Sequence, residues 1–146
     1  GGVSNGKQMK KMMDLGACGI SMGSPFIATD EAKVSDAYKQ AIVDFGAKDI
    51  VLTEKLSGSP CTVINTPYVQ KVGTKRNFLE TLLSKNKKLK KFIKMLTWYK
   101  GTKALERSAF STTYETVWCA GPSIEGVKSI RPVKQVVSDL IIDFEV

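Results

Sequence analysis

The sequence lacks several features that mark secreted or metal-binding proteins. It contains no histidine, and its three cysteines, Cys18, Cys61 and Cys119, include no CxxC pair. An odd number of widely spaced cysteines argues against a disulfide framework and against a zinc site, so we expect reduced thiols in packed positions. Without a histidine, none of these thiols has an activating partner in this sequence, which argues against a cysteine nucleophile.

Long apolar runs are also absent. The sequence has no run of about eighteen apolar residues, the length that a membrane span needs, and residues 1–20 lack the hydrophobic stretch of a secretion signal. The chain has 146 residues, of which 42% are apolar and 25% are charged. This length suits one globular domain, and the apolar content is too high for a disordered tail. We therefore expect a cytoplasmic protein with a buried core.

Positive charge is concentrated in one segment. The net charge is +8, and the residues between Lys71 and Arg107 include twelve Lys or Arg and two acidic residues. One interpretation is a basic helix at 85–94 that contacts a membrane surface or nucleic acid. We favour a solvated lysine face on a helix that packs through the apolar residues Leu89, Phe92, Ile93 and Leu96. We accordingly expect neither nucleic acid nor a membrane as a partner.

Capping residues and hydrophobic periodicity predict the elements of the first half. Ser4 or Asn5 caps a helix that runs through Leu15 and ends at Gly16. The elements expected next are a short buried strand at Gly19–Met22, a helix start at Gly23–Pro25, a helix at Val34–Phe45 and a strand at Asp49–Leu52. Asp30 and Glu31 stand near a helix start, where we expect a capping role.

The second half is predicted to be mainly helical. Proline, glycine and β-branched residues in 57–72 favour a connection that crosses the surface. Two or three amphipathic helices are expected over 77–107, with a break at Gly101. A loop at 118–123 precedes a last helix, which Pro132 opens. Its expected buried stripe is Val133, Val136, Val137, Leu140 and Ile141.

Two glycine-containing turns carry the strongest chemical signal. Gly1-Gly2 and Gly23-Ser24 each precede a predicted helix, where the backbone offers unpaired N–H groups and has no Cβ to block a ligand. In (β/α)₈ barrels a phosphate commonly lies between the last two strand loops and the start of a short extra helix. The alternative interpretation is that these glycines only form turns. Gly-Gly and Gly-Ser are common turn dipeptides, and most of them bind no ligand.

Residues 1–41 resemble the late-barrel motif of the nitronate monooxygenase (2-nitropropane dioxygenase) family. In that motif a glycine pair closes the seventh strand and a Met-Gly-Ser/Thr turn closes the eighth. Further stretches are similar to the family in the same order: 23–31 (GSPFIATDE), 37–41 (AYKQA), 53–67 (TEKLSGSPCTVINTP) and 118–123 (WCAGPS). The Lys-rich helical stretch matches least.

The resemblance implies an α/β fold that is the C-terminal portion of a (β/α)₈ TIM barrel, from the end of strand 7 onward. The expected domains are 1–72 with the last two barrel units and the phosphate site, 73–110 as a Lys-rich helical insertion, and 111–146 as a loop and closing helix. The first six strands would lie upstream. The missing part of the barrel would then be either another piece of the same polypeptide or a complementary chain. A third explanation is that the start of this sequence is an accident of gene prediction.

The same resemblance implies flavin mononucleotide (FMN) as cofactor. Backbone N–H groups of Gly1, Gly2, Gly23 and Ser24 would hold its phosphate, with Met22 lining the site. The family oxidises alkyl nitronates with oxygen and uses a histidine as base or orienting group. Since this sequence has no histidine, no catalytic residue is expected in it, and the chain alone should be inactive. No metal is expected.

Two alternatives stay open at this stage. A flavin-dependent enoyl-ACP reductase resembles the family in the same motifs but reduces its substrate with a nicotinamide cofactor. The other is a non-catalytic module whose basic helices bind nucleic acid or a membrane.

Overall fold

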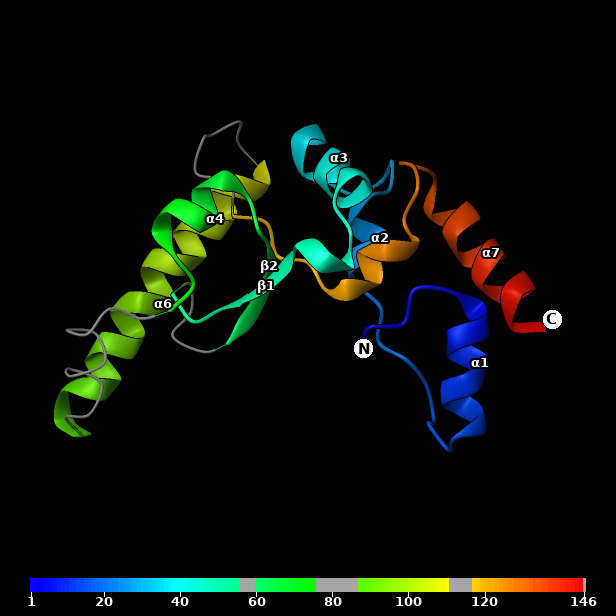
Figure 1. Cartoon of the computed structure of the whole chain (residues 1–146), viewed down its shortest axis with the longest axis horizontal. Coiled ribbons are helices and arrows are strands. Elements are labelled where there is room, and N and C mark those ends of the chain that lie inside the picture. Colours follow the sequence, from blue (N-terminus) through cyan, green and yellow to red (C-terminus); the bar gives the residue numbers. More distant parts are fainter. Residues whose placement is uncertain (56–59, 76–86, 111–116, 146) are drawn as a thin grey trace. The chain divides into compact units, whose positions relative to one another are not determined.

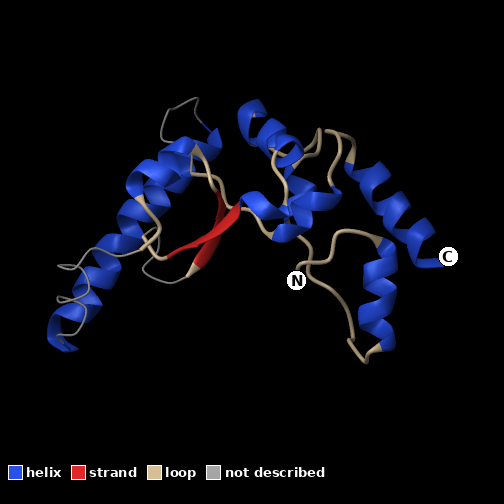
Figure 2. Ribbon diagram, viewed as in Figure 1, coloured by secondary structure: helices blue, strands red, loops and turns tan. Residues whose placement is uncertain are grey.

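The computed structural model describes residues 1–55, 60–75, 87–110 and 117–145, which form a mixed α/β structure (Figures 1 and 2). The elements are α1 (Gly6–Asp14), α2 (Ser24–Ile27), α3 (Asp36–Asp44), the 3-10 helix η1 (Ala47–Asp49), β1 (Ile50–Thr53), β2 (Cys61–Ile64), α4 (Pro67–Val72), α6 (Lys87–Phe110), the 3-10 helix η2 (Pro122–Gly126) and α7 (Val133–Glu145). The chain splits into two compact units, residues 1–49 with 120–146, and residues 50–119.

Helix α1 begins and ends where its sequence predicts. The Asn5 side chain accepts a hydrogen bond of 2.9 Å from the backbone N–H of Gln8 and caps the helix. Gly16 follows the last turn with a φ of +97°, a conformation that glycine adopts without strain. Both ends are therefore set by local residues.

Helices α1 and α7 come from distant parts of the sequence and pack side by side in the first unit (Figure 1). Gly6 lies at their contact and is buried. A Cβ added to Gly6 would lie 2.2 Å from the carbonyl oxygen of Leu140 and 2.5 Å from the backbone N of Phe144. Only a residue without a side chain allows this approach of the two backbones.

The predicted strand at Gly19–Met22 is wrong. These residues form no regular secondary structure, and Gly19 and Ser21 are exposed. A strand exists through hydrogen bonds to a neighbouring strand. The described residues supply no such neighbour for this segment, so its apolar residues cannot form a ladder.

Helices α2 and α3 start as predicted. Pro25 occupies the first turn of α2. The Ser35 hydroxyl caps α3 by accepting from the backbone N–H of Tyr38. The buried face of α3 includes Lys39, which the apolar pattern did not predict; its ammonium donates to the backbone oxygen of Asp30 at 3.1 Å. The hydrogen bond offsets part of the cost of burying this cation.

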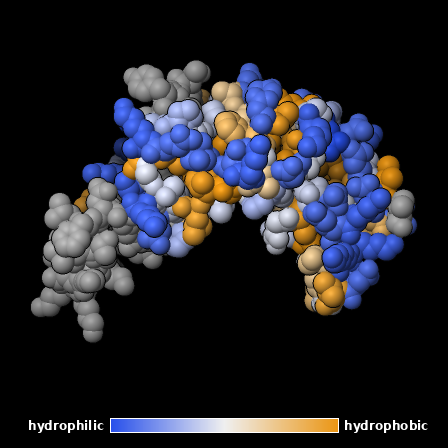
Figure 3. All heavy atoms as spheres, in the orientation of Figure 1, coloured by the Kyte–Doolittle hydropathy of each residue, from blue (hydrophilic) through white to orange (hydrophobic). Residues whose placement is uncertain are grey.

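The last helix matches its prediction at the start but not along its whole face. Val136 is buried, whereas the side chains of Val137 and Ile141 are 40% and 53% exposed. The expected stripe is therefore wrong at these two positions, because α1 and α2 cover only one side of α7. On the face of the molecule shown in Figure 3, hydrophobic residues lie at the surface among hydrophilic ones.

The second unit contains an antiparallel pair of strands that the sequence only half predicts. Strand β1 confirms the predicted strand within one residue. The residues of 57–72 favour extended and turn structure over helix in a surface connection, and the extended strand β2 agrees with this, whereas helix α4 and the burial of β2 contradict it. Val63 and Ile64 of β2 are fully buried, and Val63 also bridges to Cys119 on its other side. The burial of β2 was not predictable because it depends on residues beyond the adjacent strand β1, such as Cys119, to which Val63 bridges.

Helix α6 also differs from its prediction, because it continues through Gly101 over 24 residues. Gly101 and Ser108 are buried on one face of the helix, so tertiary packing outweighs the low helix propensity of glycine. Of the predicted packing residues, Leu96 is 42% exposed, which contradicts the expectation for it. The side chains of Leu89, Phe92 and Ile93 and the helix expected over 77–86 lie outside the described part.

We predict that Gly6→Ala separates α1 from α7. The new methyl group has no space beside Leu140, and we expect a loss of about 1–3 kcal/mol in the free energy of unfolding, measured by urea denaturation. Gly19→Ala is the matched control, because a Cβ there meets no atom within 4 Å. Equal losses in the two variants would show that the close contact does not limit stability.

Candidate functional site

In the first unit, Gly1 lies beside the segment that precedes the second glycine-containing turn. A Cβ placed on Gly1 would lie 3.9 Å from the backbone oxygen of Ser21, so the chain start lies beside the segment that leads to Gly23. Gly2 has a φ of +82°, which lies in the left-handed region that favours glycine. The two backbones thus approach each other without an intervening side chain.

Both turns face open space. A Cβ on Gly2 or on Gly23 would meet no heavy atom within 4 Å. The backbone N–H groups of these two glycines donate no hydrogen bond to any described residue. An exposed backbone donor with open space above it is suited to an anion.

Ser24 has a partner that is remote in the sequence. Its hydroxyl oxygen accepts a hydrogen bond of 2.9 Å from the backbone N–H of Gly121. A Cβ on Gly121 would lie 3.6 Å from this oxygen and 3.9 Å from the hydroxyl of buried Ser123. The Ser24 hydroxyl is held in place and keeps its own proton for donation to a ligand.

Sequence reasoning did not assign Gly121 and Ser123 to this site. The signal was present, since Gly121-Pro122-Ser123 has the same three residue types as Gly23-Ser24-Pro25 and opens the 3-10 helix η2. Its meaning depends on a contact between residues 97 positions apart. No local pattern reports such a contact.

Met22 faces a different environment. Its side chain lines an apolar cavity of about 370 Å³. The other residues around this cavity are Met9, Ile20, Phe26, Val137, Leu140, Ile141 and Phe144. Met22 therefore anchors the turn through hydrophobic contact, and its part in a cofactor site stays a prediction.

Glu31 caps a helix, as the sequence suggests for this carboxylate pair. It does so at a distance, because its side chain accepts a hydrogen bond of 2.9 Å from the backbone N–H of Val133 at the start of α7. A negative charge there also interacts favourably with the helix dipole. The side chain thus has a structural task that accounts for its position.

The thiols of Cys61 and Cys119 lie together in the second unit. Burial raises the pKa of Cys119 from 9.0 to about 11, and the adjacent Cys61 thiol adds to the shift. A raised pKa keeps the thiol protonated at neutral pH, so Cys119 is a poor nucleophile. The packed positions of Cys61 and Cys119 agree with the expectation from the sequence, whereas Cys18 is exposed, so the expectation is wrong for that residue.

The basic helix α6 exposes aromatic as well as cationic groups. Trp98 and Tyr99 are 56% and 53% exposed, and the Lys103 ammonium lies 4.8 Å from the centre of the Tyr99 ring. No described helix is both long and apolar enough to cross a bilayer. Within the described part, histidine, cysteine and acidic side chains form no group that would hold a metal ion.

Mixed α/β elements with glycine-lined backbone donors are typical of proteins that bind phosphate groups. A model of the nitronate monooxygenase family matches residues 1–143. The chain therefore belongs to the nitronate monooxygenase family, a family of flavin-dependent oxidoreductases. This confirms the resemblance drawn from the motifs.

Curated relatives show that the match is to part of a longer protein. A probable nitronate monooxygenase of Staphylococcus saprophyticus is 35% identical over 72 residues, which are 49% of this chain and 20% of the relative. A (3aS,4S,5R,7aS)-5-hydroxy-7a-methyl-1-oxo-octahydro-1H-indene-4-carboxyl-CoA dehydrogenase of Rhodococcus jostii is 27% identical over 125 residues, or 82% of this chain and 35% of the relative. The matched parts are thus a fifth to a third of these proteins.

Solved structures also match over only part of their length. FabK from Thermotoga maritima aligns with a TM-score of 0.74 and 27% identity over 99% of this chain and 42% of its own. A nitroalkane oxidase from Streptomyces ansochromogenes aligns with a TM-score of 0.63 and 20% identity, covering 99% and 38% of the two chains, and shows the fold alone. The chain therefore corresponds to about 40% of a TIM-barrel chain.

We predict that Cys18 and Cys119 differ in alkylation. Cys18 is exposed, whereas the pKa of about 11 leaves Cys119 with about a hundredfold less thiolate at pH 8 than a thiol of pKa 9.0. Iodoacetamide at pH 8, followed by peptide mass mapping, should modify Cys18 first. The reactivity of Cys119 should rise with pH towards 11, and equal rates at pH 8 would contradict its burial.

Proposed function

We propose that the chain supplies the phosphate end of an FMN site in an enzyme that oxidises alkyl nitronates. The observation that carries this proposal is the position of Gly1 beside the backbone oxygen of Ser21, with open space over Gly2 and Gly23. A phosphate dianion fits such a surface because it accepts several hydrogen bonds at once. Membership of a flavin-dependent family supports this choice of ligand.

The residues of this chain would bind and orient the cofactor. The backbone N–H groups of Gly1, Gly2, Gly23 and Ser24 would donate to the phosphate, and the hydroxyl of Ser24, held by Gly121, would add a further donor. Met22 would keep its turn in place from the apolar side. When bound, FMN supplies the electron transfer between the nitronate and oxygen.

The reacting end of the site would come from elsewhere in the complete protein. The sequence has no histidine, so the base or orienting group would lie upstream, or on a complementary chain, with the first six strands of the barrel. In this proposal the chain extends from the end of strand 7, is inactive alone, and belongs to a cytoplasmic enzyme. The division into 1–72, 73–110 and 111–146 stays a prediction about the domains of the complete barrel. The two compact units have other boundaries, after residues 49 and 119.

An enoyl-ACP reductase is the second candidate function. It is favoured by the alignment with FabK from Thermotoga maritima over 99% of this chain, at a higher TM-score than that of the nitroalkane oxidase. Such an enzyme would use the same phosphate site but would take electrons from a nicotinamide cofactor. The phosphate site therefore does not discriminate between the two.

We predict that the complete protein, purified with its flavin, consumes oxygen when given an alkyl nitronate. The readout is oxygen uptake with 2-nitropropane nitronate, compared with oxidation of NADH or NADPH in the presence of an enoyl thioester. Flavin reduction by the nitronate under anaerobic conditions should precede oxygen uptake. Enoyl-dependent oxidation of the nicotinamide, with no reaction of the nitronate, would establish the reductase instead.

We predict that Gly2→Asp lowers the affinity for FMN at least tenfold, because a carboxylate would face the phosphate. Gly2→Asn is the matched control, since asparagine has nearly the same shape, tolerates a positive φ and has no charge. The measurement is fluorescence titration of the apoprotein with FMN. Similar affinity in the Asp and Asn variants would count against a phosphate at Gly2.

A further inference from the structure

The second unit contains a cavity for which the proposed flavin site has no use. It has a volume of about 190 Å³, and the described residues that line it all lie between 53 and 117. Its walls come from strands β1 and β2, helix α4 with the glycine after it, and helix α6. The cavity is therefore a property of residues 50–119 alone.

The interior of the cavity is apolar. Val63, Val69 and Val117 line it and form the buried core cluster of this unit. On α6 the lining residues are Gly101 and Ala104. Glycine within a helix costs about 1 kcal/mol relative to alanine, and these two small residues leave unfilled the space that larger side chains would occupy.

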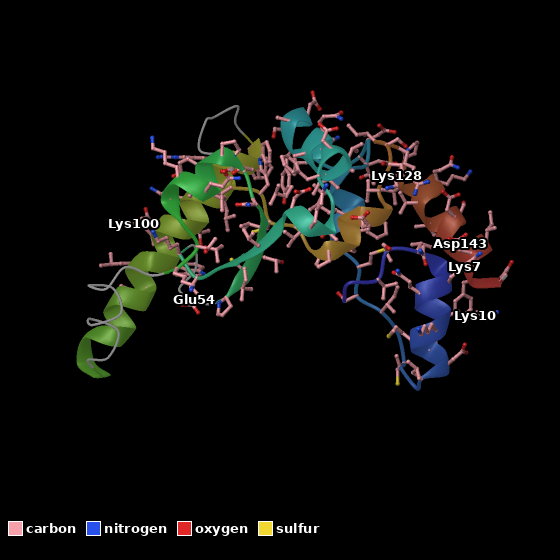
Figure 4. The ribbon with its side chains drawn as sticks, viewed as in Figure 1. Lys7, Lys10, Glu54, Lys100, Lys128 and Asp143 are labelled. Atoms are coloured by element: carbon pink, nitrogen blue, oxygen red, sulfur yellow. The ribbon has the colours of Figure 1, made fainter. Side chains whose placement is uncertain are left out.

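The rim of the cavity is cationic. Lys55 and Lys100 both line it, none of the described lining residues is acidic, and neither lysine forms an ion pair with a described carboxylate. Lys100 extends from the exposed side of α6 (Figure 4). Two ammonium groups beside an apolar space form an uncompensated positive charge.

Lys55 is held in position by the main chain. Its ammonium donates to the backbone oxygen of Val72, the last residue of α4, and lies 3.8 Å from the Cβ position of Gly73. The C-terminal end of a helix favours a cation. An ammonium group has three donors, so those not used by Val72 remain for a ligand.

We propose that this cavity binds a small organic monoanion with a short apolar tail, of which a short-chain carboxylate is the simplest example. A cavity of about 150 Å³ with apolar walls is large enough for benzene, so this volume suits a tail of about four to six carbons. The anionic group would lie between Lys55 and Lys100, and the tail would lie against the valines. A cation of the same shape would be repelled at the rim.

The test uses the complete protein, labelled with ¹⁵N and titrated with hexanoate. Hexanoate should shift the amide signals of Gly101 and Val117 with a dissociation constant on the order of 1 mM or tighter. Hexylammonium has the same tail and the opposite charge, and it should bind at least tenfold more weakly. Failure of hexanoate to shift these signals, or equal binding of hexylammonium, would overturn the proposal.

Three variants separate the contributions of the cavity. Lys100→Met removes the charge but keeps the apolar stem, and it should weaken hexanoate binding about threefold to tenfold. Lys103→Met is the matched control one turn further along α6, outside the cavity lining, and it should change nothing. Ala104→Leu should fill the cavity and abolish binding; unchanged binding in this variant, with the amide spectrum still that of a folded protein, would also overturn the proposal. FMN affinity is measured in a separate experiment. A loss of FMN binding would therefore not affect the interpretation of the hexanoate titration.

Discussion

The first unit depends on the close approach of two helix backbones at Gly6. Because α1 and α7 meet without a side chain between them at this point, the chain can bring residues 1–14 against residues 133–145. That contact positions the start of the chain, where Gly1 lies beside Ser21. Backbone groups packed this closely leave no room for a side chain, so the contact between α1 and α7 depends on glycine at this position.

Helix ends were predictable where the determining residues are local. The side chains of Asn5 and Ser35 cap their helices by accepting a hydrogen bond from the backbone N–H three residues later. Gly16 ends α1 through its own positive-φ backbone conformation. Elements that need a remote partner were not predictable. Gly19–Met22 has the composition of a strand but no neighbour among the described residues, whereas β2, in a proline-containing stretch, pairs with β1. Gly101 has low helix propensity, yet packing on one face of α6 keeps the helix continuous.

The same distinction applies to the candidate site. The glycine turns can be identified from residue types and from their order, and the structure adds that Gly1 lies beside the backbone of Ser21, just before the second turn. It also adds Gly121, whose N–H fixes the hydroxyl of Ser24. The sequence contains Gly121 in a motif of its own, but a bond across 97 residues has no periodicity from which it can be inferred. The residue types of these turns could therefore be read from the sequence, whereas their spatial arrangement could not.

The division of the chain has a consequence for the order of synthesis. Residues 50–119 form a unit that is inserted between the two parts of the other, residues 1–49 and 120–146. On a ribosome, the inserted unit is complete before α7 is translated, so its strands and helices can assemble while α1 still lacks its packing partner. Until α7 is synthesised, the apolar residues of α1 and α2 that line the cavity beside Met22 remain exposed to solvent and to chaperones.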